Sequence, residues 1–201
     1  MKVKTHVKLG ELSLIKNRHA IPKGFSKFMF NFGLVMVDQS WLVKTHPHYM
    51  QKSLDYINEK IEELLSIKSF NAYYSMQLGI VVHYLCDFCC NSHISGSIGK
   101  ISYHLKYERE LQKYLFNNFD ILKNKILNKS NNLNLTFHNM SSIKTSIDNT
   151  LRNYINGDSS YFGDIKHCVQ ISSFVCSMIF NFNINLSNSI EYSKKEFQLS
   201  N

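Results

Sequence analysis

The chain is short of residues that interrupt helices, because its 201 residues include only two prolines, Pro22 and Pro47, and eight glycines. It also has little of the polar and apolar alternation that predicts β-strands. Apolar residues instead recur at positions i, i+3 and i+4, which is the spacing of one face of an α-helix. We therefore predict an all-α fold, a multi-helix bundle that forms a single domain over residues 1–201.

Long apolar runs are missing as well. No stretch reaches the roughly 18 consecutive apolar residues that a transmembrane helix needs, and the N-terminal sequence MKVKTHVKLGELSLIKN lacks the apolar segment of a secretory signal. Five cysteines, an odd number, argue against a complete set of disulfides and for a reducing compartment. These absences predict a cytoplasmic protein, with no more than peripheral contact with a membrane.

Charged residues are scarce, at 19% of the chain, and they are unbalanced, with a net charge of +8 at pH 7. A basic surface attracts the phosphate groups of nucleic acids or of anionic lipids. The lysines are scattered singly, however, and no run of five basic residues occurs. We therefore do not expect a dedicated surface for nucleic acid.

The apolar spacing and the loop-forming residues between apolar segments divide the chain into helices. The segment 70–90 is apolar on nearly all sides, so it should be the buried central helix. Loops are expected at 37–47, at 96–99 and within the asparagine-rich stretch 124–139, and the polar C-terminal residues should fray. The predicted helices cover residues 7–16, 24–35, 48–66, 70–90, 101–116, 141–155 and 160–180.

The most informative stretch is HYLCDFCCNSHISGSIGKISYHLKYERE. It contains two pairs at helical i, i+4 spacing, His83 with Asp87 and His104 with Glu108, and each pair shares one face of its helix. His93 follows Asp87 too closely to lie on that same face, so it should sit at or beyond the end of the helix. Alone, each pair is more typical of an ordinary contact between histidine and carboxylate. Together, three histidines and two carboxylates predict a metal site between facing helices.

Zinc is the metal that this set of residues favours, because imidazole and carboxylate are both good zinc ligands and a catalytic zinc keeps one position open for water. The constellation therefore points to a hydrolase. Further candidate ligands lie upstream, at His6, Asp38, His46 and His48.

The same stretch resembles the zinc-dependent phospholipase C family, in which H-x-x-x-D-x-x-x-x-x-H is followed by H-x-x-x-E. The segments THVKLG and GLVMVD near the start of the chain are similar to the short branch of this family from low-GC Gram-positive bacteria. The resemblance covers about the first 115 residues and implies the helical bundle shared by phospholipase C and P1 nuclease. It also implies two or three zinc ions, with ligands in three sets: Asp38, His48 (or His46), His83 and Asp87; His93, His104 and Glu108; and His6 with a bridging Asp87.

The third set is the least complete one, because secreted relatives add to it the amino group and carbonyl of an N-terminal tryptophan, which this chain lacks. The family resemblance implies a phosphodiesterase in which a zinc-bound hydroxide attacks a glycerophospholipid, giving diacylglycerol and a phosphorylated head group. Asp38 is the candidate general base. Access to a membrane would depend on the basic surface and on aromatic residues such as Phe28, Phe30 or Trp41, although each is more typical of a core residue.

Three other interpretations stay open. A single-strand nuclease of the S1/P1 type would have a similar fold and zinc cluster. A helical binding protein stabilised by zinc would have closed metal sites and no turnover. A structural zinc site built from Cys86, Cys89 and Cys90 with His93 is the weakest interpretation, because thiols on a buried helix usually act as small apolar side chains.

Overall fold

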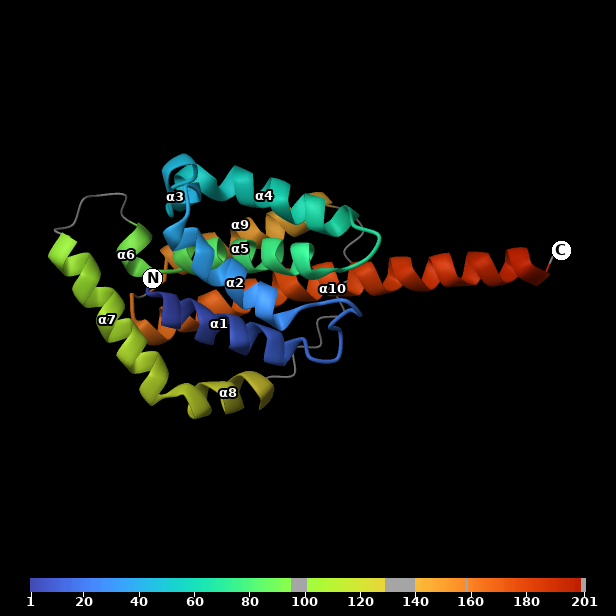
Figure 1. Ribbon diagram of the computed structural model, residues 1–201. Helices are drawn as coiled ribbons and strands as arrows, with labels where there is room; N and C mark the ends of the chain where they lie inside the picture. Colours follow the sequence, from blue (N-terminus) through green and yellow to red (C-terminus); the bar gives the residue numbers. More distant parts are fainter. Residues whose placement is uncertain (95–100, 129–139, 158, 200–201) are drawn as a thin grey trace.

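The computed structural model describes residues 1–94, 101–128, 140–157 and 159–199, with the backbone alone described for 126–128, 140 and 185–199. All regular secondary structure in these residues is helical, which confirms the all-α prediction (Figure 1). That residues 1–201 form one domain stays a prediction. The helices are α1 (Val3–Lys16), α2 (Lys27–Gln39), α3 (Leu42–Thr45), α4 (Met50–Ser66), α5 (Ala72–Phe88), α6 (Asn91–Ile94), α7 (Ile101–Asn117), α8 (Phe119–Asn128), α9 (Met140–Ile155) and α10 (Tyr161–Leu199).

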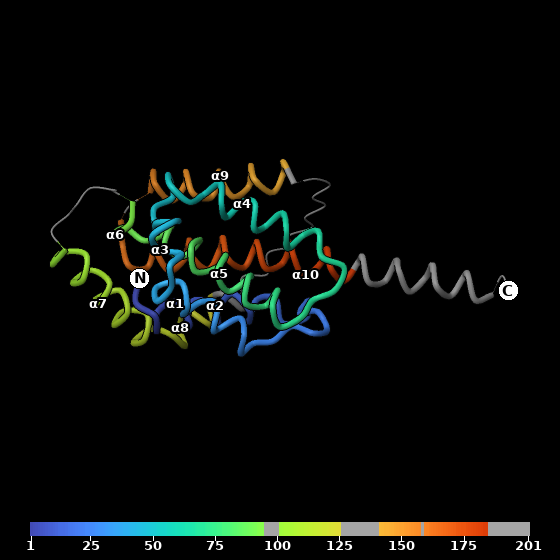
Figure 2. Tube along the Cα trace, turned by 45° about the horizontal axis from the view of Figure 1, so that its top comes forward, coloured from blue at the N-terminus to red at the C-terminus, as the bar shows by residue number. Residues whose placement is uncertain are grey.

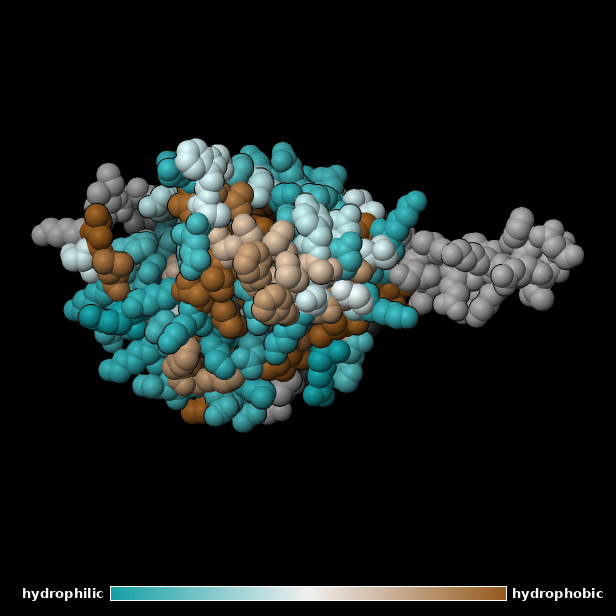
Figure 3. Space-filling view, viewed as in Figure 1, coloured by the Kyte–Doolittle hydropathy of each residue, from teal (hydrophilic) through white to brown (hydrophobic). Residues whose placement is uncertain are grey.

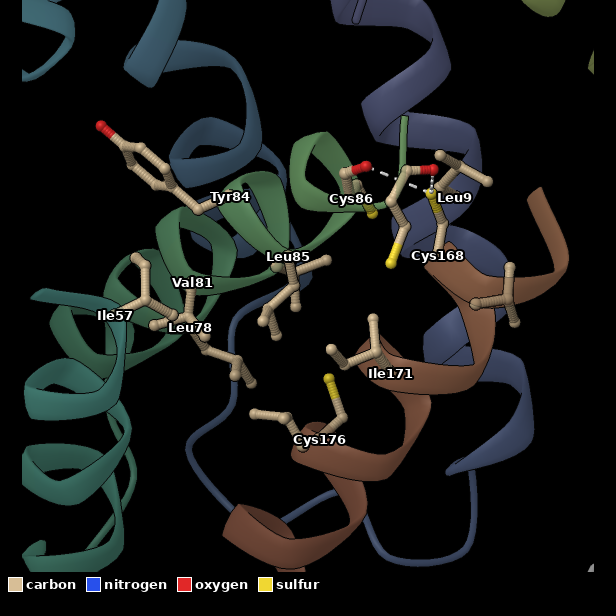
Figure 4. Close-up of a cluster of buried hydrophobic side chains, with 14 of the residues drawn as sticks. Leu9, Ile57, Leu78, Val81, Tyr84, Leu85, Cys86, Cys168, Ile171 and Cys176 are labelled. Atoms are coloured by element: carbon tan, nitrogen blue, oxygen red, sulfur yellow. Dashed lines mark hydrogen bonds between the residues drawn. The ribbon is translucent and has the colours of Figure 1, made fainter. Parts of the chain in front are cut away.

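Helix α5 is the centre of the bundle, as its apolar composition predicts. Every residue from Leu78 to Phe88 is buried. The Asn71 side chain starts the helix by accepting a hydrogen bond from the backbone N–H of Tyr74. Apolar side chains of α5 lie against those of α10, such as Ile171, in the core shown in Figure 4. Because neighbouring helices pack around α5, the polar side chains in its buried part have fixed positions.

Several helix boundaries differ from the predicted ones. The loop predicted at 37–47 is wrong for most of its length, because α2 continues to Gln39 and α3 follows at once. The last helix also continues beyond its predicted end at residue 180, since α10 reaches Leu199, and fraying of the C-terminal residues stays a prediction. Fully buried Val37 explains the first difference: its core contacts keep the backbone helical beyond the predicted end at 35. The predicted loop at 96–99 lies outside the described residues, as does most of the one at 124–139.

Helices α2 and α5 cross in direct backbone contact, because a glycine of each faces the other. A Cβ atom on Gly79 would meet the carbonyl oxygen of Phe30, and a Cβ atom on Gly33 would meet that of Met76. Only hydrogen fits between the two backbones at this crossing. The close approach sets how far the C-terminal end of α2 lies from the C-terminal half of α5, where the candidate site is found.

We expect Gly79→Ala to lower the free energy of unfolding by about 3 kcal/mol, because the new methyl group must push two backbones apart. Chemical denaturation would measure the loss. Gly10→Ala is the matched control, since a Cβ atom there meets the flexible ends of the Leu34 and Phe30 side chains and not backbone. Equal losses in the two variants would contradict this account of the crossing.

Chain segments that are distant in sequence meet at one end of the bundle. The N-terminus, α3, α6 and the beginning of α7 all lie at this end in both Figure 1 and Figure 2. Within the described residues, none of the helices combines the length and the apolar character needed to cross a membrane.

Candidate metal centre

The eight predicted ligands come from six parts of the chain and meet at this end of the bundle. Their nitrogen and oxygen atoms form four overlapping groups, and the ligand atoms within a group lie within 4.8 Å of one another. The structure places His6 on α1, Asp38 on α2, His48 before α4, His83 and Asp87 on α5, His93 on α6, and His104 and Glu108 on α7.

The alternative ligand His46 points elsewhere. Its ring stacks on Tyr56 with the ring centroids 3.7 Å apart, and its carbonyl oxygen accepts a hydrogen bond of 2.6 Å from the Tyr84 hydroxyl. None of the four groups in the described residues includes it. The geometry therefore favours His48.

Asp87 faces two sets of ligands at once. Its Oδ1 atom lies 2.6 Å from the amino nitrogen of Met1 and 3.4 Å from His6 Nε2. Its Oδ2 atom lies 2.7 Å from His48 Nδ1 and 3.2 Å from His83 Nε2. A carboxylate with one oxygen in each set is suited to bridge two cations.

Asp38 completes the set around His48 and His83. Its Oδ1 atom lies 3.7 Å from His48 Nδ1 and 3.6 Å from His83 Nε2. The Asp38 side chain is 25% exposed, whereas that of Asp87 is fully buried. Burial raises the pKa of Asp38, and the neighbouring histidines only partly offset this rise. Of the carboxylates in this set, Asp38 is the one that solvent can reach.

Glu108 joins the two remaining histidines. Its Oε1 atom lies 3.3 Å from His93 Nε2 and 2.9 Å from His104 Nε2. The His104 side chain is 32% exposed, so this set is more open than the one around His83. The other ring nitrogen of His104 donates a hydrogen bond to the carbonyl oxygen of Ser92, which leaves Nε2 with a lone pair for a cation.

The amino group of Met1 is a member of the cluster that the residue pattern alone does not reveal. Besides Asp87, it lies 3.1 Å from Glu108 Oε1. Burial would lower the pKa of this amino group, but the adjacent carboxylates outweigh burial and raise it to about 11. The only sequence signal for it is the N-terminal tryptophan of the family pattern. At pH 7 the Met1 amino group is an ammonium that pairs with the two carboxylates, and it must lose its proton before it can add a second nitrogen to the set that contains His6.

The hydrogen bonding of His83 tests whether a metal fits. Its Nδ1 atom lies 2.8 Å from the carbonyl oxygen of Leu34, and a carbonyl can only accept, so Nδ1 carries the proton. In the neutral ring, Nε2 then points a lone pair at carboxylate oxygens of Asp38 and Asp87. Two acceptors that face each other in a buried site repel unless a cation lies between them.

A proton on His6 is a poor substitute for that cation. The rings of His6 and His83 stack with their centroids 3.7 Å apart, and both are fully buried. Burial, reinforced by repulsion from His83, lowers the pKa of His6 to about 3, so His6 is neutral at pH 7 and both of its buried ring nitrogens lack a hydrogen-bond partner. A neutral imidazole is the form that binds metal, so the residues present fit zinc.

Two carboxylates of the cluster are held ionised. Burial would raise the pKa of Glu108, but the hydrogen bond from His93 and the Met1 amino group lower it to about 2. For Asp87, burial is likewise outweighed, by the Met1 amino group and the surrounding histidines, and its pKa lies well below its usual range. The cluster therefore offers anionic oxygen beside the neutral imidazole of His6, and carboxylate with imidazole is the donor set of catalytic zinc.

The cysteines take no part in this centre. All five are free and buried, and none of the metal-binding groups found in the described part of the chain contains a thiol. Burial raises the pKa of Cys90 to about 12, which disfavours the thiolate that zinc needs.

Comparison with known proteins yields one finding. The model of a family described as zinc dependent phospholipase C matches residues 5–161. No curated protein and no solved structure matches the chain.

Proposed function

The chain belongs to the zinc-dependent phospholipase C family, and we propose that it hydrolyses the phosphodiester bond of glycerophospholipids to diacylglycerol and a phosphorylated head group. The observation that carries this proposal is the pair of acceptors at His83 Nε2 and Asp87 Oδ2, 3.2 Å apart in a buried site. Such a pair calls for a cation at the centre of the ligand cluster.

Zinc would be held by the three sets described above, with Asp87 shared between two of them. When bound, zinc ions neutralise charge on a phosphate and lower the pKa of a bound water. The chain's own residues have two tasks. Two histidines fix the position of the centre, because buried His83 is oriented by the Leu34 carbonyl and His104 by the Ser92 carbonyl.

Asp38 has the second task, which is to move a proton. Its Oδ1 atom faces His48 and His83, so Oδ2 is left to accept a proton from the attacking water. The new bond joins the water oxygen to phosphorus, and the bond between phosphorus and the glycerol oxygen breaks. The proton then passes to that glycerol oxygen, which completes diacylglycerol.

We also propose peripheral contact with a membrane at the open end of the site. Trp41 follows Asp38 by three positions and is 68% exposed, and Ile101 and Leu105, which flank His104 on α7, are 77% and 56% exposed. Figure 3 shows hydrophobic side chains gathered at the beginning of α7 and over α2. Lys44 lies 4.2 Å from the centroid of the Trp41 ring, so a cation accompanies the apolar contact. Phe30, by contrast, is fully buried and cannot serve this purpose.

Trp41→Ser combined with Ile101→Ser should reduce hydrolysis of anionic vesicles about tenfold or more, since each side chain contributes roughly 1.5–3 kcal/mol when it leaves water. Hydrolysis of a monomeric short-chain phospholipid should be unchanged. Phe28→Ser is the matched control, because Phe28 is 77% exposed but lies at the opposite end of α2 from Asp38. The same loss on monomeric substrate would place the two residues in the catalytic site and not at the membrane.

Three substrates offered side by side to the zinc-loaded protein test the proposed function: phospholipid vesicles, a soluble phosphodiester and single-stranded DNA. Release of diacylglycerol and a phosphorylated head group is the expected result. Cleavage of DNA without lipid hydrolysis would assign the centre to a nuclease. Stoichiometric zinc without turnover of any substrate would make the chain a binding protein.

A further inference from the structure

A buried carboxylate outside the ligand cluster, Asp164, connects four helices. It lies in the first turn of α10 and is fully buried. Its Oδ2 atom accepts hydrogen bonds from the Tyr107 hydroxyl at 2.8 Å and from the backbone N–H of Asn91 at 3.1 Å. Its Oδ1 atom accepts one from the Tyr154 hydroxyl at 2.7 Å. The donors come from α7, α6 and α9 respectively.

Two of those helices carry the ligands of the more open set. Asn91 is the first residue of α6, which carries His93, and Tyr107 directly precedes Glu108 on α7. Helix α6 has only four residues, and a helix this short is stable only through contacts with the rest of the protein. Its first N–H has no partner inside the helix, and Asp164 supplies one.

The chemistry of Asp164 suits an anchor. Burying a carboxylate is costly unless several donors satisfy it, and three donors do so here. Burial raises the pKa of Asp164, while the hydrogen bonds from Tyr154, Asn91 and Tyr107 oppose that rise. None of its oxygens faces the ligand cluster in the contacts described, so its role is not to bind the ion.

We propose that Asp164 is a positioning residue for the zinc ion held by His93, His104 and Glu108, because it fastens α6 to α7. The inference depends on the zinc centre of the proposed function and not on the substrate. Residue 164 also lies beyond residues 5–161, which the family model matches, so the match assigns it no role.

Two tyrosines provide a matched pair of variants. Tyr107→Phe and Tyr154→Phe each remove one hydroxyl that donates to Asp164, but only Tyr107 lies on a helix that carries ligands. We expect Tyr107→Phe, like Asp164→Asn, to weaken binding of the zinc held by His93, His104 and Glu108 about 10–100-fold. Tyr154→Phe should leave that affinity unchanged. Competition with a chromophoric chelator measures the zinc affinity of each variant. Circular dichroism shows that each variant is folded.

His104→Ala identifies the affected ion, because it removes a ligand from the set of His93, His104 and Glu108 directly. The tyrosine pair keeps the test decisive even where Asp164→Asn fails to fold. Equal zinc affinity in Tyr107→Phe and Tyr154→Phe would overturn the proposal, and so would a wild-type chain that binds no zinc. A wild-type chain that binds zinc but hydrolyses no lipid would overturn the proposed function while leaving this inference standing.

Discussion

Replacing Asp87 with alanine should remove zinc and activity together, with kcat/KM lowered by more than about a thousandfold. Asp87 places one oxygen beside His6 and the Met1 amino group, and the other beside His48 and His83. Its loss therefore breaks two ligand sets at once. Elemental analysis of zinc per chain and a phospholipid hydrolysis assay on the same preparation measure the two quantities.

The alanine variant also leaves a buried amino group without its closest carboxylate, and removing one partner of a buried ion pair costs about 3–5 kcal/mol of stability. Asp87→Asn keeps the volume of the side chain and separates loss of zinc from loss of fold. Asp55→Ala, at an exposed position on α4, controls for the removal of one carboxylate. Full zinc content and full activity in Asp87→Asn would refute the bridging role.

The central helix and the ligand pairs can be predicted from the sequence, because both depend on the spacing of residues that are close together in the chain. The apolar composition of 70–90 predicts the buried helix that the structure shows as α5. The i, i+4 spacing places His83 and Asp87 on one face, and their atoms lie 3.2 Å apart. Short-range geometry of this kind is determined by the helix itself.

What the sequence does not reveal depends on contacts between distant segments. The backbone carbonyl of Leu34, which orients His83, has no residue signature at all. Helix α6, which carries His93, is too short to show a periodic pattern, and its first N–H donates a hydrogen bond to Asp164, 73 positions away from Asn91. The extension of α2 that brings Asp38 to the site depends on the burial of Val37 in the core. Each of these is a tertiary contact that overrides or completes local preference.

Replacing Asp38 with asparagine should lower kcat about 10²–10⁴-fold with much smaller loss of zinc, because the amide keeps an oxygen for the metal but cannot accept a proton. Glu108→Gln makes the same chemical change in a residue to which we assign metal binding alone. Its activity should fall in proportion to its zinc content.

Added zinc separates the two roles. Raising the zinc concentration should restore activity to Glu108→Gln by mass action, whereas Asp38→Asn should stay inactive even when its zinc content equals that of the wild-type chain. Recovery of Asp38→Asn by zinc would show that Asp38 is a ligand and nothing more. The proton acceptor would then have to be sought among the other groups that solvent can reach at this end, of which His104, 32% exposed, borders the same centre.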